Sequence, residues 1–354
     1  VRVIAPPTGA NLGPGFDVLG VAYLILENSR DTLSGDVITA RKTDKFRGVK
    51  LIDVINNPGL PIDSQNVAQA AGQYILDASG EFLGVELILD KRMPIGSGLG
   101  SSASSSVDSA VAVNALLENP FPRNHKKMLE AVVHGEAIAT KGLGHADNVF
   151  PALFGGFVFI EDLNNYHYRR FLGGERMYFV VASPNLRSDT GEMRRALQSA
   201  PYDIPGLVKL TSDFLKRYLE GDLMDTDLID LSKFVKNGGK IENVIDYLKG
   251  ALSLIIGIRN QSATVLGNAM MTDKIVTPVR ARYIIGYDNV KDAALSAGAT
   301  GFIISGSGPA VVSSAYSQRD AEIIGDAKRR AFERNGVESK IYVAKVDNVG
   351  ARLI

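Results

Sequence analysis

A run of glycines and serines between residues 94 and 106 is the part of the sequence best suited to chemistry. Three glycines at alternating positions lead into two serines over residues 96–102. Glycine lets the backbone approach a ligand closely and adopt left-handed angles. If a helix begins directly after the run, its free N–H groups and its dipole form a site for an anion such as phosphate. The serine hydroxyls could add a hydrogen bond or an oxygen ligand for Mg²⁺.

Two well-known phosphate-binding patterns do not describe this run. A P-loop has a lysine directly after its last glycine, whereas Ser101 follows Gly100 here. The dinucleotide pattern Gly-x-Gly-x-x-Gly needs a wider spacing than Gly96, Gly98 and Gly100 provide. An ordinary strand-to-helix turn capped by serines is the alternative that the residues alone leave open.

The elements around the run are those that an anion site needs. A β-branched segment at 85–89 predicts a strand before it, and an alanine-rich segment reaching about residue 117 predicts a helix after it. Further helices are predicted over residues 66–76, 126–139, 207–220, 243–261, 288–297 and 320–335. Further strands are predicted over residues 1–4, 18–26, 149–160, 177–183, 300–305, 310–315 and 339–346.

These elements interleave without the steady alternation of a doubly wound sheet. That order predicts an α+β fold made of two mixed domains packed together. We expect the domains to span residues 1–180 and 181–354, with the boundary falling between Leu172 and Ser188.

Composition and charge exclude several classes of protein. The 354 residues include 39 Lys+Arg and 39 Asp+Glu, so the chain lacks the basic surplus typical of proteins that bind duplex DNA or RNA. The absence of cysteine excludes disulfides, zinc–thiolate sites and a cysteine nucleophile. The apolar runs are far shorter than the roughly 20 residues of a membrane span, and the first residues lack the layout of a signal peptide. We therefore expect a cytoplasmic protein that binds neither nucleic acid nor membrane.

Three motifs together give the chain a resemblance to a known family. PIGSGLGSSASSS at 94–106 resembles the second motif of the GHMP kinases, which include galactokinase and mevalonate kinase. NLGPGFD at 11–17 resembles their first motif, and ISGSGPA at 304–310 resembles their third, in the same order. The resemblance implies a two-domain α+β fold with the active site at the domain junction. It also implies ATP and Mg²⁺ as cofactors and a small alcohol as phosphate acceptor.

Three further segments resemble the branch of the family that acts on L-homoserine. They are HADNVFPALFGGF at 145–157, PNLRSDTGEMRRAL at 184–197 and AMMTDKIVTPVR at 269–280. The resemblance therefore implies ATP-dependent phosphorylation of the homoserine hydroxyl to O-phospho-L-homoserine, a step of threonine biosynthesis. It leaves residues 216–250 unmatched. The tendency of the family to dimerise predicts a homodimer.

The resemblance also assigns residues to the substrate amino acid. Arg194 and Arg280 are expected to clamp the carboxylate, because a guanidinium can form two parallel hydrogen bonds with it, and Thr190 would assist. Asp17 and His145 would bind the ammonium group. Asn11 and Asn148 would lie near the hydroxyl. The full set is Asn11, Asp17, His145, Asn148, Thr190, Arg194 and Arg280. Without the family, Arg194 would be read as a solvated helix residue, Asp17 as a turn residue and Asn148 as a helix cap.

A second set is assigned to the nucleotide and its metal. Ser102 and Glu136 are expected to hold Mg²⁺ and the β- and γ-phosphates, and together with Asn148 they form the predicted catalytic set. Asn66 matches the family's position beside the adenine, although a polar residue at a helix start is the ordinary alternative. The expected nucleotide-binding residues are Asn66, Pro94, Ile95, Gly96, Ser97, Gly98, Leu99, Gly100, Ser101, Ser102, Ser305 and Gly306.

One position bears on the mechanism. Mevalonate and galactose kinases of the family carry an aspartate that can accept the proton of the substrate hydroxyl, but this chain has Asn148, which cannot accept one at neutral pH. Asp147 is adjacent, and we expect its side chain to point elsewhere because neighbouring residues diverge. Transfer would then rest on positioning and electrostatic stabilisation. On this basis Asn148→Ala should lower kcat strongly and Asp147→Asn should leave it nearly unchanged.

Two other functions stay open on the sequence alone. One is a kinase of the same fold that acts on threonine, mevalonate or shikimate, and the other is a catalytically silent ligand sensor. The paired arginines favour an amino acid over mevalonate, which has no ammonium group for Asp17. The intact glycine run and the presence of Glu136 argue against a silent sensor.

Overall fold

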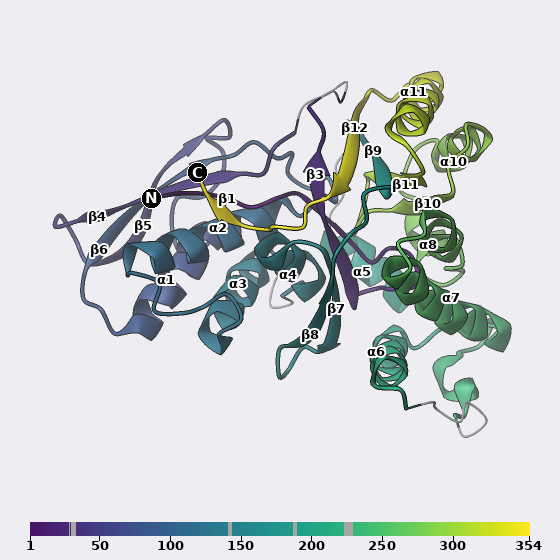
Figure 1. Ribbon diagram of the computed structural model, residues 1–354, viewed down its shortest axis with the longest axis horizontal. Helices are drawn as coiled ribbons and strands as arrows, with labels where there is room; N and C mark the ends of the chain where they lie inside the picture. The colour runs from purple at the N-terminus through teal and green to yellow at the C-terminus, as the bar shows by residue number, and fades with distance from the viewer. Residues whose placement is uncertain (28, 30–32, 141–143, 187–189, 223–228) are drawn as a thin grey trace.

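The computed structural model describes residues 1–27, 29, 33–140, 144–186, 190–222 and 229–354. These residues form two sheets placed side by side in an elongated molecule (Figure 1). The first sheet has five strands in the order β13-β1-β4-β6-β5. Its strands are β1 (Arg2–Ile4), β4 (Val37–Thr43), β5 (Gly48–Ile55), β6 (Gly84–Asp90) and β13 (Arg352–Leu353).

Four helices share a single apolar core with the first sheet. They are α1 (Val67–Ser79), α2 (Ser101–Leu116), α3 (Lys126–Ala139) and α4 (Ala146–Phe154). Of these, α1 and α2 pack directly on the strands of the sheet. Helix α2 is buried on nearly every side, as its alanines and serines allow, because small side chains let neighbouring elements approach closely. Its first turn therefore has a fixed position beneath the glycine run.

The second sheet has eight strands and antiparallel pairing throughout its described strands. The order is β10-β11-β9-β12-β3-β7-β8, with β2 also paired to β3. Its strands are β2 (Thr8–Ala10), β3 (Leu19–Ile25), β7 (Phe157–Asp162), β8 (His167–Phe171), β9 (Tyr178–Pro184), β10 (Gly301–Ile304), β11 (Val311–Ala315) and β12 (Ser339–Val346).

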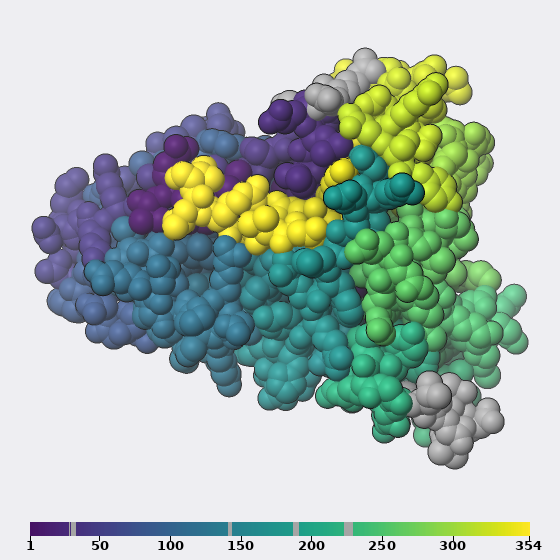
Figure 2. All heavy atoms as spheres, in the orientation of Figure 1, coloured from purple at the N-terminus to yellow at the C-terminus, as the bar shows by residue number. Residues whose placement is uncertain are grey.

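The remaining helices lie around this second sheet (Figure 1). In the space-filling view the green and yellow-green part of the chain forms the right-hand end of the molecule (Figure 2). Those with longer amphipathic faces are α6 (Ile204–Glu220), α7 (Ile241–Arg259), α10 (Tyr287–Ser296) and α11 (Gln318–Arg334). Shorter ones are α5 (Thr190–Gln198), α8 (Ala263–Met270), α9 (Thr277–Ala281) and the 3₁₀ helix η2 (Leu231–Phe234). Helices α10 and α11 cover β9–β11, whereas α7 and α8 share a core with β3 and β9.

The predicted α+β class is confirmed, and α3 and β12 have the predicted bounds. Two local predictions were wrong. Residues 149–154 form the end of α4 rather than a strand, because an element buried on all sides shows no helical period in its sequence. Thr8–Ala10, which lies between the predicted strands 1–4 and 18–26 and was assigned to no element, forms β2 against β3. Strands β4, β5 and β8 were not predicted.

Both sheets contain strands from each side of residue 180, where the domain boundary is expected. The division into two domains at that residue stays a prediction. Strand β3 pairs with β12, where Ile25 faces Ala344, and β1 pairs with β13, where Val3 faces Leu353. Segments distant in sequence are thereby brought to the junction between the two sheets. None of the described helices is long and apolar enough to cross a membrane.

Candidate active site

Three loops meet at the junction of the two sheets and are hydrogen-bonded to one another. The first loop (11–17) joins β2 to β3, the phosphate loop (94–100) joins β6 to α2, and the third loop (305–309) joins β10 to β11. The Asn11 amide donates to the Gly306 carbonyl at 3.0 Å. Ser305 Oγ donates to the Gly98 carbonyl at 2.7 Å. All three sequence motifs therefore belong to one site.

The phosphate loop has the backbone that an anion site requires. Gly96, Gly98 and Gly100 have φ of 65°, 81° and 69°, angles that favour glycine over any other residue. Gly100 is the N-cap of α2, and no side chain caps the helix. The first turn also contains no acidic residue. The N–H groups at the start of α2 are therefore available to an anion, and the helix dipole favours its charge.

A buried ion pair fastens both flanks of the phosphate loop, and sequence reasoning missed it. Lys91, just after β6, is paired with Asp36, and both side chains are almost entirely buried. The Lys91 ammonium also donates to the Ser101 carbonyl at 2.8 Å and to Ser105 Oγ at 2.9 Å. Asp36 accepts from the backbone N–H groups of Arg92 and Met93, each at 2.9 Å. The three N–H bonds of Lys91 are thus used inside the protein.

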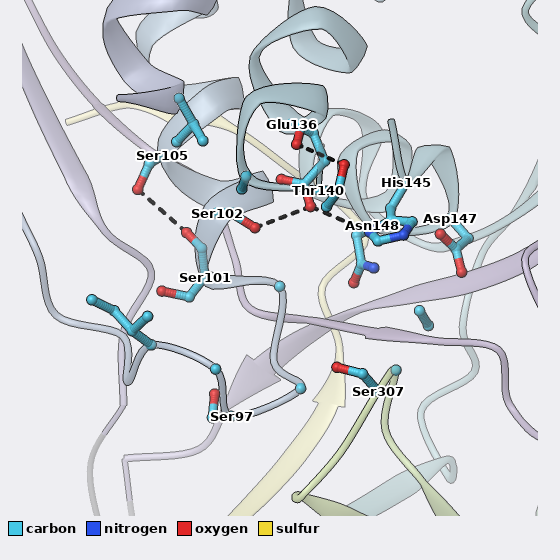
Figure 3. A pocket seen from close by; sticks show the side chains of 18 of the residues that line it. Ser97, Ser101, Ser102, Ser105, Glu136, Thr140, His145, Asp147, Asn148 and Ser307 are labelled. Carbon is cyan, nitrogen blue, oxygen red and sulfur yellow. Dashed lines mark hydrogen bonds and ion pairs between the residues drawn. The ribbon is translucent and has the colours of Figure 1, made fainter. Parts of the chain in front are cut away.

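One corner of the pocket has the oxygen atoms that a hard cation prefers. Ser102 Oγ donates to Glu136 Oε1 at 3.0 Å, and His145 Nδ1 lies 3.5 Å from the same oxygen (Figure 3). Glu136 Oε2 is buried and has no hydrogen-bond partner among the described residues. Within the described ranges, no three His, Cys, Asp or Glu side chains are placed so that together they could hold a metal ion. One carboxylate and one hydroxyl fit Mg²⁺, which commonly takes its other ligands from water and substrate phosphates.

The opposite side of the pocket has two arginines from separate helices. Arg194 of α5 donates through Nη2 to both carboxylate oxygens of Asp17, at 3.0 and 3.2 Å. Arg280 of α9 donates through Nη1 to the Gly306 carbonyl at 2.6 Å, and its burial lowers the pKa of the guanidinium to about 10. The Nε atoms of both arginines are buried without a partner in the described structure. Such unpaired donors suit a carboxylate ligand.

Asp147 lines this pocket, so the expectation that its side chain points elsewhere was wrong (Figure 3). It follows His145 at the start of α4, where the first helical turn opens onto the site. Burial and the charge of Asp17 raise the pKa of Asp147 to about 7, although His145, Arg194 and Arg280 oppose the rise. Burial lowers the pKa of His145, but its bond to Glu136 and the charges of Asp147 and Glu136 outweigh burial and raise it overall.

Asn148 is held by a residue that the sequence motifs did not include. Thr8 Oγ1, on β2, donates to Asn148 Oδ1 at 2.9 Å. That bond fixes the amide so that its Nδ2 group is left to donate into the pocket. A Cβ added at Gly100 would lie 1.9 Å from Thr8 Oγ1. Only glycine at position 100 therefore leaves space for the hydrogen bond between Thr8 and Asn148.

Most of the predicted residues line one pocket. They are Asn11, Asp17, Asn66, Ile95, Gly96, Ser97, Gly98, Gly100, Ser101, Ser102, Glu136, His145, Asn148, Arg194, Arg280 and Gly306. Pro94, Leu99 and Ser305 do not line it: Leu99 packs in the core and Ser305 is buried under the phosphate loop. Thr190 begins α5, and its side chain lies outside the described part of the chain.

Other pocket residues were not predicted, among them Leu60, Pro61, Gln65 and Thr140. Asn66 caps α1 by accepting from the Ala68 N–H at 2.9 Å, and its amide donates to the Pro61 carbonyl at 2.8 Å. Asn66 is therefore a polar residue at a helix start, as the alternative to a nucleotide-binding role predicted. It also lines the pocket, which is compatible with a second role beside a nucleotide base.

Comparisons with known proteins agree with this geometry. The family model "GHMP kinases N terminal domain" matches residues 66–156, which contain the phosphate loop, Glu136 and Asn148. The chain is 34% identical to homoserine kinase of Arabidopsis thaliana, covering 100% of this chain and 84% of the relative. It is 32% identical to homoserine kinase of Pyrococcus furiosus, covering 98% of each.

A solved structure extends the likeness to three dimensions. The crystal structure of homoserine kinase from Cytophaga hutchinsonii has a TM-score of 0.81 and 31% identity to this chain, covering 100% of this chain and 97% of its own. The fold is that of a GHMP kinase. The chain belongs to the homoserine kinase family.

Proposed function

We propose that this protein transfers the γ-phosphoryl group of ATP to the hydroxyl of L-homoserine. The observation that carries the proposal is that a single pocket joins an uncapped helix start to two arginines with unpaired N–H groups. The helix start suits phosphates, and the arginines suit a carboxylate. The carboxyl groups of Asp17 and Asp147 add negative charge for an ammonium group, and the mostly buried His145 lines the same part of the pocket. The pocket therefore matches a nucleotide and an amino acid together.

In this proposal the phosphates lie on the N–H groups of residues 98–102. Ser102 and Glu136 would hold Mg²⁺, which neutralises phosphate charge and polarises the transferred group when bound. Arg194 and Arg280 bind the amino-acid carboxylate. In this proposal the substrate hydroxyl lies between the two halves of the pocket, near the Asn148 side-chain amide.

Asn148 donates from Nδ2 to the oxygen of the substrate hydroxyl. This hydrogen bond orients the oxygen so that one of its lone pairs is directed at the phosphorus. The Oδ1 of Asn148 is occupied by Thr8, and an amide does not accept a proton at neutral pH. The chain therefore supplies orientation and charge stabilisation at this position rather than a strong base. A loose phosphoryl-transfer transition state tolerates such a weakly activated nucleophile.

Several further assignments go with this proposal. Mg²⁺ is the metal, since it fits the Ser102–Glu136 pair. The reaction belongs to threonine biosynthesis in the cytoplasm, and the enzyme is a homodimer. The family membership supports these assignments.

The test is an ADP-release assay with homoserine, threonine, mevalonate and shikimate as acceptors. We expect turnover with homoserine at a kcat/KM at least about ten-fold above the others, because the arginines and acids select a zwitterion. Glu136→Gln serves as the control for contaminating kinases and should lose most of the activity. Preference for another acceptor would replace homoserine as the substrate. Saturable binding without turnover on all four would select a ligand sensor instead.

A further inference from the structure

Helix α7 touches the active site without lining its pocket. The Phe16 N–H, in the first loop, donates to the Tyr247 hydroxyl at 3.3 Å. Both residues are about 2% exposed, and Tyr247 is absent from the pocket wall. This bond therefore joins the first loop to α7 from the side away from the ligands.

Phe16 is buried directly behind the amino-acid half of the site and does not itself line the pocket. The guanidinium carbon of Arg280 lies 4.8 Å from the centre of the Phe16 ring. The next residue is Asp17, which has φ of 58° and pairs with Arg194. A positive φ at a non-glycine residue persists only where the surroundings hold it. The position of Phe16 thus sets the positions of both arginines and of Asp17.

Close glycine contacts seat the first loop on the neighbouring helices. A Cβ at Gly250 of α7 would lie 1.8 Å from Thr272 Oγ1 and 3.0 Å from Pro14. A Cβ at Gly13 would lie 2.3 Å from the Met270 carbonyl. Two of the glycines in this region therefore serve helix–loop packing rather than the approach of a ligand.

One apolar cluster binds these pieces together. It combines Phe16 with residues of α5, α6 and α7 and with the segment just before α9. Its buried members are Phe16, Leu197, Ala200, Tyr202, Leu207, Leu210, Val244, Tyr247, Leu248, Ile275 and Val276. The helices that present Arg194 and Arg280 and the loop that presents Asp17 thus share a single support.

We propose that α6 and α7 form a buttress for the amino-acid half of the active site, with Tyr247 as a positioning residue. The buttress includes part of the segment 216–250 that no sequence motif matched. The inference rests on the proposed function, because its readout is the use of homoserine. The phosphate loop is fastened separately, by Lys91 and Asp36, so the buttress governs the amino acid and not the nucleotide.

The test is steady-state kinetics of Tyr247→Phe with each substrate varied in turn. Removing the hydroxyl leaves the Phe16 N–H buried without a partner and frees the first loop to shift. We expect KM for homoserine to rise roughly three- to ten-fold, the range that one hydrogen bond supports. KM for ATP should stay within about two-fold of the wild-type value, because the phosphate loop does not share this bond.

Tyr202→Phe is the matched control. Tyr202 belongs to the same cluster and is about as buried, but its hydroxyl accepts from Lys240 and Asn243 rather than from the first loop. It should lower stability comparably and leave KM for homoserine unchanged. Gly250→Ala, which presses on Pro14 and Thr272, should raise KM for homoserine as Tyr247→Phe does.

An unchanged KM for homoserine in Tyr247→Phe, or an equal rise in Tyr202→Phe, would overturn the buttress. A rise in KM for ATP as large as that for homoserine would overturn it as well. Failure of the wild-type protein to phosphorylate homoserine would instead count against the proposed function, so the two failures are distinct.

Discussion

Asp147 and Asp17 place two carboxyl groups in one buried pocket with a histidine and two arginines. At about neutral pH Asp147 is partly protonated, because burial and Asp17 raise its pKa to about 7. An incoming ammonium group favours the ionised form of this carboxyl. Ligand binding and the ionisation of Asp147 are therefore linked.

We expect KM for homoserine to fall as the pH rises through about 7, because the ionised Asp147 binds the ammonium group more strongly. Asp147→Asn should raise KM for homoserine and flatten this pH dependence, while the expectation that it leaves kcat nearly unchanged stays a prediction. Kinetics across the pH range with ATP saturating measure both effects. An Asp147→Asn enzyme with the wild-type pH profile would contradict the assignment.

The same pKa has a consequence for stability, whose sign follows from linkage. Between the ordinary value of 3.8 and about 7 the folded chain keeps the Asp147 proton that the unfolded chain has released. The folded state binds more protons in that range, so the free energy of unfolding falls as pH rises. The raised pKa of His145 acts in the same direction. Urea denaturation at several pH values should show the decline in the wild-type protein and a smaller one in Asp147→Asn.

At the scale of elements, the phosphate loop depends on the strand before it and the helix after it. Lys91 stands at the end of β6, and Asp36 stands just before β4. Together they join the strand end to the first turn of α2. The loop is therefore shaped before any ligand arrives.

Asp36→Asn should destabilise the protein by about 3–5 kcal/mol, because it leaves the Lys91 charge buried without its partner. Urea denaturation measures this loss. The double variant Asp36→Asn with Lys91→Met should recover part of it, since no charge then stays buried. A single variant as stable as the wild-type protein would show that the pair contributes little to the loop.

The sequence was sufficient to predict the phosphate loop but not what fastens it. Glycine spacing and a run of small residues have local causes, so the loop and α2 could be predicted directly. Asp36 and Lys91 are separated by 55 positions, and neither stands in a motif that indicates pairing. Thr8 is likewise an isolated threonine in the sequence, and only the β2–β3 pairing brings it to Asn148.

Helix α4 shows a different limit. Its described side chains are nearly all buried, so the segment has no polar face to reveal a helical period. The expectation that Asp147 and Asn148 diverge came separately, from the rule that neighbouring side chains point apart on a helix or a strand. Helix α4 begins at the pocket, and the side chains of Asp147 and Asn148 in its first turn both line the same cavity (Figure 3).

At the scale of the whole molecule, the two sheets are built from interleaved parts of the chain. Strands β3, β7 and β8 precede residue 180, yet β3 pairs with β12 near the other end of the sequence. Strand β13 pairs with β1 in the opposite sheet. Cutting the chain at the predicted boundary would therefore break both sheets.

A fragment of residues 1–180 is accordingly expected not to fold cooperatively, because β3 would lose its β12 partner and β1 its β13 partner. Circular dichroism during urea denaturation should show a broad, non-cooperative change for the fragment and a sharp transition for the whole chain. Co-expression with residues 181–354 is the control and should restore the sharp transition. A fragment that unfolds sharply by itself would establish an independent domain ending near residue 180.

The uncapped start of α2 has a consequence for how this enzyme tolerates change. In the proposed function the groups that face the phosphates are peptide N–H groups, which almost every amino acid has, so replacing a side chain at a position other than glycine leaves them in place. Alanine substitution of the residues other than glycine would therefore understate the importance of this segment, whereas at Gly98 and Gly100 an added Cβ has no room. Replacing a single amide by an ester, which removes the donor and spares the side chain, would expose that importance.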